Sequence, residues 1–243
     1  MITSKSNELI KKCLQIKQKK YSKQLGLCLV ESLKLVKELD EKGLTQTILV
    51  VESKYNLFSN SKTRVEIVSD TVASLLSDAV TTDGVFAICK ILNSSNIDYS
   101  KCIILDRIQD PTNIGAILRS ACAFGYNTIF AIDSVYPYSF KSIRSSMGNI
   151  FNVNYIDIKL DDLIKLKSLH NIDFVVADMN GEDLSSFQKD SNKNIAIVIG
   201  NEGQGVSDEI LKVSDKIVSI PMQNDVESLN ASVSAGIIMY VLK

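Results

Sequence analysis

The stretch IAIVIGNEGQGV, residues 195–206, decides the fold of this chain. It begins with a continuous apolar run and ends in three glycines, Gly200, Gly203 and Gly205, with Glu202 among them. Such a run, closed by glycine, predicts a buried parallel strand that leads into a tight loop. Because glycine has no side chain to keep a ligand away from the backbone, this loop is a candidate ligand-binding element.

A second stretch, IPMQNDVESLNASVSAGIIMY at 220–240, predicts how the chain ends. We expect a short strand over 218–221, a polar loop, and a final helix that Ser228 or Asn230 caps. Open α/β sheets bind ligands at loops that leave the carboxyl ends of their strands. The two stretches therefore predict one shared site.

The composition predicts an ordinary globular protein with one large domain or two small ones: 243 residues, 45% hydrophobic and 23% charged. No apolar run approaches the length of a membrane span, and the first residues lack the apolar core of a signal peptide. Five widely spaced cysteines without a CxxC pair, and the single histidine His170, argue against a metal site and against His-based nucleophilic catalysis. We expect reduced thiols in a cytoplasmic protein.

Positive charge is unevenly distributed, although the formal net charge is only -1. Lysines crowd the N-terminus, opposed only by Glu8, and this indicates either a surface for nucleic-acid phosphates or a solubilising helix face. Arginine is scarce, and three of the four lie between positions 107 and 144, which suggests a need for its planar charged fork. The clustered lysines are Lys5, Lys11, Lys12, Lys17, Lys19, Lys20 and Lys23.

Alternating patterns predict two α/β regions joined by a polar linker over 93–99. In the first region we expect helices over 1–25, 31–41 and 69–76, and strands over 25–30, 47–51, 65–68 and 84–91. In the second, from about 101 to 243, we expect strands over 102–105, 128–132, 152–156 and 174–178, the last ending in a turn at MNGED. Its helices are expected over 160–167 and from Ile114, where Asn113 is the cap, to Gly125. Strands that alternate with helices predict a largely parallel sheet.

GNEGQG matches neither a phosphate-binding P-loop, since no GK[ST] follows, nor the spacing of a GxGxxG dinucleotide fingerprint. On these residues alone, we expect only a nucleotide-like ligand between 200–205 and 220–230.

Three blocks stand in order in the second region: NIGAILRSA from Asn113, IGNEGQG from Ile199, and IPM with VESLNASV ending at Val233. They resemble the ordered motifs of the SpoU/TrmH-type RNA 2′-O-ribose methyltransferases of the SPOUT superfamily, over about 104–240. LCLVESLKLVKE and FAIC resemble, more loosely, that family's small N-terminal substrate-binding domain. Ser32 departs from the family there, where a glycine is usual.

The resemblance implies a fold that the residues alone do not. It implies an α/β domain over 101–243 with a mostly parallel sheet and a C-terminal trefoil knot, a rare feature in proteins. It also implies a small α/β domain over 1–95, similar to ribosomal protein L30, that binds the RNA substrate. S-adenosylmethionine is the implied cofactor. RNA and a second copy of the chain are the implied partners, with no DNA and no membrane partner and no metal.

The resemblance also implies roles for individual residues. Arg119 would hold the phosphate beside the target ribose as a fork, because its guanidinium is already protonated at neutral pH and so cannot easily accept the hydroxyl proton. Glu202 would orient the loop, reach across the dimer or serve as the base, and Asn113, Ser228 and Asn230 would position the ribose or merely cap helices. The implied cofactor-binding residues are Gly200, Ile220, Leu229, Met179, Gly205 and Ser232. The implied RNA-binding residues are Arg144, Lys12, Lys19 and Lys20, with a solvated loop as the alternative for Arg144.

The leading interpretation is methylation of a ribose 2′-hydroxyl in RNA, with 23S ribosomal RNA favoured by analogy. The alternatives are a transfer-RNA 2′-O-methyltransferase and a non-catalytic RNA-binding protein of the same fold. A small-molecule nucleotide enzyme with an ordinary doubly wound sheet is a third possibility.

Overall fold

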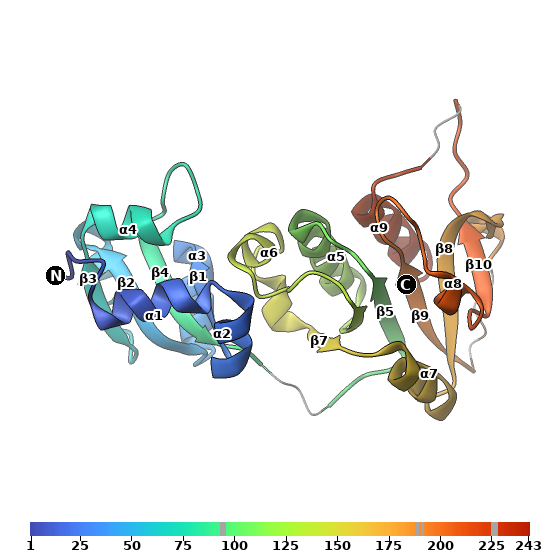
Figure 1. The fold of residues 1–243 in the computed structure, drawn as a ribbon, viewed down its shortest axis with the longest axis horizontal. Coiled ribbons are helices and arrows are strands. Elements are labelled where there is room, and N and C mark those ends of the chain that lie inside the picture. The colour runs from blue at the N-terminus through green and yellow to red at the C-terminus, as the bar shows by residue number, and fades with distance from the viewer. Residues whose placement is uncertain (93–95, 188–189, 191, 225–227) are drawn as a thin grey trace. The chain divides into compact units, whose positions relative to one another are not determined.

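The structure is a computed structural model that describes residues 1–92, 96–187, 190, 192–224 and 228–243 (Figure 1). The described chain forms two compact units, one of Met1–Leu92 with Tyr138–Gly148 and the other of Asn93–Pro137 with Asn149–Lys243. Part of the predicted linker, 93–95, and part of the third sequence block, 225–227, lie outside the described residues. No helix in the described ranges has the length and apolar character needed to span a membrane.

The first unit contains a four-stranded sheet in the order β1-β4-β2-β3. β4 runs antiparallel to both β1 and β2, and β3 runs parallel to β2. The strands are β1 (Leu27–Glu31), β2 (Thr45–Val51), β3 (Arg64–Val68) and β4 (Val85–Lys90). The helices of the first unit are α1 (Glu8–Ile16), α2 (Lys19–Leu25), α3 (Leu33–Glu41), η1 (Glu52–Phe58), α4 (Asp70–Leu76) and α6 (Phe140–Ser145).

Both faces of this sheet are covered, because side chains along each strand alternate between them. Leu27 and Leu29 of β1 join a buried cluster that also holds residues of α1 and α4. α3 contacts β1, β2 and β4 and contributes nothing to that cluster, so it covers the opposite face.

The segment 138–148 packs with the first unit although the chain reaches it after two strands of the second. Phe140 is buried in the cluster with α1, and a side chain added at Gly148 would collide with Leu35 of α3. α6 contacts β1, which is an edge strand of the sheet. Because an exposed edge invites pairing with other chains, this cover protects it. The sequence assigned this segment to the second region, and its packing is decided by Phe140.

The second unit contains a six-stranded sheet in the order β10-β8-β9-β5-β6-β7. Every pairing described in it is parallel, which confirms the predicted parallel α/β sheet. The strands are β5 (Lys101–Asp106), β6 (Thr128–Ile132), β7 (Asn154–Asp157), β8 (Ile172–Asp183), β9 (Asn194–Ile199) and β10 (Lys216–Ser219). The helices are α5 (Pro111–Phe124), η2 (Asn149–Asn152), α7 (Leu160–Leu169), η3 (Leu184–Ser186), α8 (Asp208–Leu211) and α9 (Ala231–Val241).

Two helical layers enclose this sheet. Alternate strand residues such as Ile104 and Val198 pack with Leu163 of α7 and Ile210 of α8. α5 and α9 pack against each other, as Figure 1 shows, and α9 also contacts β9. β9 is therefore buried on both faces, which explains its continuously apolar sequence.

Three local predictions were wrong. The helix expected over 1–25 is two helices, because the buried stripe of α1 stops at Ile16 and Gln18 takes an extended backbone. MNGED is not a turn after a strand but lies within β8. α5 begins at Pro111 and is capped by Asp110, not by Asn113, because proline suits the first helical position.

Candidate functional site

A cavity of about 360 Å³ lies in the second unit at the carboxyl ends of β9 and β10 and beside the middle of β8. Its volume falls within the usual range of small-molecule sites, about 300–1,000 Å³. Residues of β8, of the loop after β9 and of the chain from β10 into α9 line it. The site therefore lies at the predicted edge of the sheet, between the two stretches that the sequence singled out.

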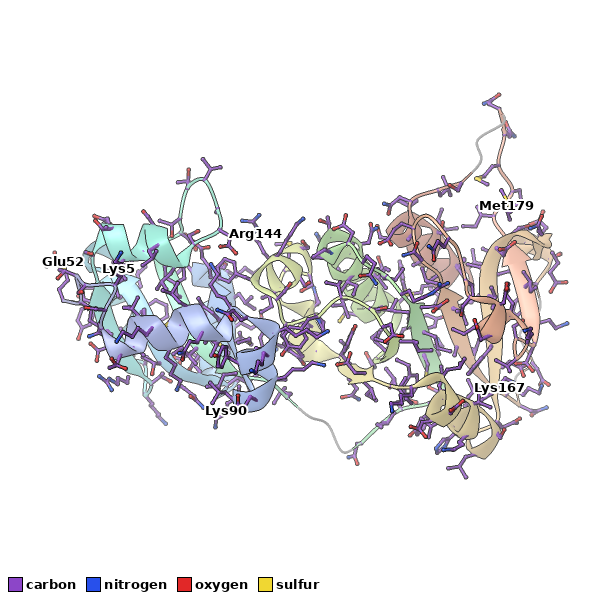
Figure 2. The ribbon with its side chains drawn as sticks, in the orientation of Figure 1. Lys5, Glu52, Lys90, Arg144, Lys167 and Met179 are labelled. Carbon is purple, nitrogen blue, oxygen red and sulfur yellow. The ribbon has the colours of Figure 1, made fainter. Side chains whose placement is uncertain are left out.

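One wall of the cavity is an irregularity in β8. β10 pairs with Val175 and Val176 and then with Glu182 and Asp183, so the intervening residues of β8 bulge out of the ladder. Three of them, 177–179, line the cavity. A side chain at Gly181 would lie 2.6 Å from the backbone of β10, so the bulge requires glycine there. Figure 2 labels Met179 on this bulge, and its side chain is 62% exposed.

The glycine loop after β9 forms the second wall. Asn201 and Gly205 exchange backbone hydrogen bonds of 3.0 and 2.9 Å, and the side-chain oxygen of Asn201 accepts from the amides of Gly203 and Gln204. A side chain at Gly200 would lie 2.3 Å from the backbone of Gly205 and Val206. The loop thus folds back on its own first residue, which only glycine permits.

Polar side chains from all three sequence blocks form one hydrogen-bonded chain beside the cavity. Asn113 Nδ2 donates to Glu202 Oε1 at 2.9 Å, and Asn230 Nδ2 donates to Asn113 Oδ1 at 3.0 Å. Asn230 Oδ1 in turn accepts from the amide and the hydroxyl of Ser232, at 2.9 and 2.7 Å. The start of α5, the glycine loop and the start of α9 are therefore held in a fixed mutual position.

Glu202 is arranged to remain a carboxylate. Besides Asn113, it accepts from the amides of Gln109 and Asp110, each at 3.3 Å. Burial is the largest influence and raises the pKa of Glu202, but these hydrogen bonds together outweigh it and the pKa falls below its ordinary value of 4.5. A carboxylate with a lowered pKa is a weak proton acceptor. The geometry favours the orienting role of Glu202 over the role of base.

The corrected start of α5 explains why Asn113 is available to Glu202. Asp110 caps the helix by accepting from the amide of Thr112 at 2.7 Å, so no cap is required from Asn113. Asn113 is the third residue of the helix, within its first turn, and is buried. At the other end of the hydrogen-bonded chain of side chains, Asn230 caps α9, as the sequence predicted.

Sequence reasoning singled out neither Asp106 nor Asn201, and it noted Arg107 only as one of the few arginines. Asp106 is buried at the end of β5, where it accepts from the amide of Ser207 at 2.7 Å and pairs with Arg107. The available signal was an acidic residue followed by a rare arginine directly after an apolar strand. Asn201 shapes the glycine loop from within, while Asp106 and Arg107 bond to the loop from the end of β5.

Most of the predicted cofactor residues line the cavity: Gly200, Gly205, Met179, Ile220 and Leu229. Glu202 and Ser228, predicted as catalytic, line it too. Ser232 does not belong to the described lining, and its described hydrogen bonds run to Asn230.

The predicted RNA-facing residues lie elsewhere. Arg119 is exposed in the middle of α5 and is not among the described residues that line the cavity. Arg144 is exposed on α6 in the first unit (Figure 2), not in the unit that holds the cavity. Lys19 and Lys20 are exposed on α2, and Lys12 is half-buried on α1.

Comparison with known proteins matches two family models to the chain. The SpoU rRNA Methylase family model matches residues 100–240, and an MRM3-like substrate binding domain matches residues 7–87.

Individual proteins are similar to the whole chain or to part of it. A Bacillus subtilis protein named 23S rRNA (guanosine(2553)-2′-O)-methyltransferase RlmP is 26% identical, covering 100% of this chain and 98% of its own. The AdoMet-bound rRNA methyltransferase from Sinorhizobium meliloti shares the fold, with a TM-score of 0.88 at 23% identity over 99% of this chain and 95% of that one. The A. aeolicus TrmH/SpoU tRNA modifying enzyme is 26% identical with a TM-score of 0.52, covering 59% of this chain and 74% of its own.

Proposed function

The chain belongs to the SpoU rRNA methylase family, and from this premise we propose that it methylates a ribose 2′-hydroxyl in ribosomal RNA with S-adenosylmethionine as methyl donor. The observation that carries the proposal is the cavity between the glycine loop and the start of α9, with the Glu202–Asn113–Asn230 chain at its side. The family's three sequence blocks converge there.

The lining suits an adenosyl ligand. Apolar side chains such as Ile199, Val218 and Ile238 offer an apolar contact for a base, while Asp178 and Ser228 offer polar groups. The absence of a side chain at Gly200 leaves the backbone open to close approach. We assign cofactor binding to Gly200, Gly205, Met179, Ile220 and Leu229, with Ser232 supporting them through Asn230. The cofactor supplies a methyl group on a sulfonium that a hydroxyl oxygen can attack.

The residues beside the cavity align the acceptor. Ser228 is exposed in the lining, and Asn230 is fixed by Asn113 and Ser232, so both can hold a ribose in one orientation. Alignment of two reacting groups alone contributes several kcal/mol to a rate. Glu202 holds Asn113 in place as a hydrogen-bond acceptor.

Arg119 is proposed to bind the phosphate beside the target ribose, and to do so from a second copy of the chain. The support is its position: it is exposed on α5 yet outside the described lining of its own cavity. Replacement by lysine keeps the charge but removes the two-pronged hydrogen bonding, so we expect Arg119→Lys to lose most of the turnover. Near-normal turnover would reject the fork.

A homodimer through α9 is proposed because this helix has an exposed apolar face. Val233, Ile237, Tyr240 and Val241 are 48%, 36%, 57% and 48% exposed, and their spacing places them on one face of α9. An apolar face on the last helix favours cover by another protein surface. A second copy would cover this face and bring Arg119 to the site that lacks it.

Ribosomal RNA is favoured over transfer RNA by the first unit. The B. subtilis ribosomal enzyme matches the chain over its whole length, whereas the A. aeolicus tRNA enzyme covers 59% of it. We propose that domain 1–95, with an L30-like fold, docks on the RNA. Lys12, Lys19, Lys20 and Arg144, all in the first unit, would contact phosphates.

Two further features of the family are proposed for domain 101–243. A trefoil knot is supported by the return of the chain from β10, at the sheet edge, to α9 beside α5. Stretching a single unfolded molecule tests it, because a knot leaves the chain shorter than its full extended length. A cytoplasmic location is supported by the five free thiols.

The decisive experiment measures transfer of labelled methyl groups to purified RNA. We expect the protein to modify 23S rRNA from cells that lack it, at one 2′-oxygen mapped by primer extension, and to leave tRNA unmodified. Modification of tRNA alone supports the first alternative. RNA binding without any transfer supports the non-catalytic one.

A further inference from the structure

Arg107 adopts a backbone conformation that is unfavourable for its residue type. It follows β5 directly and has φ of 58°, in the left-handed region where residues other than glycine are uncommon. Such a conformation persists when the surrounding contacts require it, and it clusters at functional sites. The contacts of Arg107 show what requires it.

Both the backbone and the side chain of Arg107 hold the glycine loop. Its carbonyl oxygen accepts from Asn201 Nδ2 at 2.8 Å, and Asn201 is the residue that organises the turn. One guanidinium nitrogen donates to Gln204 Oε1 at 3.1 Å, and the other lies 3.5 Å from the carbonyl oxygen of Gly205. Nε donates to Asp106, which is 1% exposed, at 3.2 Å.

Through these contacts Arg107 connects a buried anion to the cavity wall. Asn201, Gln204 and Gly205 all line the cavity, whereas Arg107 is outside its described lining. Asp106 is fixed in turn by the amide of Ser207, just beyond the loop. The loop is therefore held from β5 at both of its ends.

We propose that Arg107 is a positioning residue that presets the glycine loop for the methyl donor. The proposal rests on the proposed function, because it takes the cavity to be the cofactor site. A loop that is already ordered loses less conformational entropy when a ligand binds, so its affinity is higher. The left-handed backbone of Arg107 directs its carbonyl to Asn201, and the guanidinium secures the far side of the turn.

Two substitutions separate these contributions. Arg107→Gly keeps the backbone conformation at no strain but removes every guanidinium contact. Arg107→Lys keeps a positive charge beside Asp106, but its donors lie on one nitrogen and cannot reach the separate acceptors that the guanidinium fork spans. We expect S-adenosylmethionine to bind about tenfold more weakly to the glycine variant and a few-fold more weakly to the lysine variant, since hydrogen bonds to charged groups are stronger than those between neutral groups.

Asn171→Gly is the matched control. Asn171 also has a left-handed backbone, with φ of 50°, and lies in the same unit but outside the described cavity lining. We expect its affinity for the cofactor to equal that of the unmodified protein. A loss as large as that of Arg107→Gly would show that relief of backbone strain, and not the lost contacts, causes the effect.

Calorimetric titration with S-adenosylmethionine, steady-state kinetics and amide hydrogen exchange provide the readouts. We expect KM for the cofactor to rise while kcat changes less than about twofold. Without ligand, we expect hydrogen exchange of the 203–205 amides to become about tenfold faster, because the loop is less ordered in the variants. Unchanged exchange of these amides, or unchanged affinity in both variants, would overturn the proposal. If Arg107→Gly does not fold, the lysine variant decides.

The exchange measurement separates this proposal from the proposed function. An unmodified protein that binds no S-adenosylmethionine refutes the cofactor assignment. Faster exchange of 203–205 in the variants would still establish that Arg107 orders the loop.

Discussion

Replacing Gly200 with alanine tests whether the backbone of the glycine loop shapes the cofactor site. The added Cβ would lie 2.3 Å from the carbonyl carbon of Gly205 and from the amide nitrogen of Val206. Ordinary contact begins at 3.4 Å, so the loop has to move by about 1 Å. Both obstacles are backbone atoms, which cannot rotate away as a side chain does.

The size of the effect follows from this overlap. Forcing an extra methyl group into a packed site costs about 1–3 kcal/mol. If the loop yields and the protein stays folded, that energy is lost when the ligand restores the original shape. The affinity for S-adenosylmethionine would then fall about 5- to 150-fold.

Gly203→Ala in the same loop is the control. Its Cβ would meet nothing closer than 3.8 Å, and its φ is not in the left-handed region. Calorimetric titration of both variants, with a thermal melt to confirm folding, makes the comparison. The reasoning fails if Gly200→Ala binds the cofactor within about twofold of the unmodified protein, or if Gly203→Ala is equally impaired.

Three other predictions concern the charge, assembly and thiols of the protein. Burial raises the pKa of Glu202, but hydrogen bonds to its carboxylate outweigh burial, so the pKa is lowered overall. Its contribution to stability is therefore complete above pH 4.5, the ordinary pKa, and is lost as the pH falls through the lower pKa of the folded protein. The unfolding free energy of Glu202→Gln should therefore be lower at neutral pH and converge with that of the unmodified protein in acid; a constant gap would contradict this. Ile237→Glu should convert a dimer to a 26.8 kDa monomer in sedimentation, while Val80→Glu, on the surface of the first unit, should not. Burial raises the pKa of Cys89 and Cys102 to about 12, so alkylation near pH 8 should be slowed roughly a thousandfold relative to the unfolded chain; equal rates would show that the thiols are open.

The pattern of apolar residues and glycines along the sequence was sufficient to predict the larger features of the fold. The apolar run before Gly200 predicted the buried strand β9, and alternation with helices predicted the parallel sheet. Three ordered blocks pointed to the family and hence to the cavity. These features are local in sequence, since periodicity and glycine placement act over a few residues.

Other features had no local signal. MNGED reads as a turn, yet it lies within β8 and contains the end of a bulge, because β10 pairs with Val176 and next with Glu182, and Gly181 admits the close approach. The segment 138–148 lies between strands of one sheet but packs with the other unit, because Phe140 finds its apolar partners there.

The sequence by itself determined the strands, the glycine loop and the residue types of the site. Only the tertiary structure decided that Asn113, Glu202 and Asn230 bond to one another and that Arg107 holds the loop. The physical reason is distance along the chain. A hydrogen bond between residues 89 or 117 positions apart depends on how the whole sheet folds, and no short pattern encodes that.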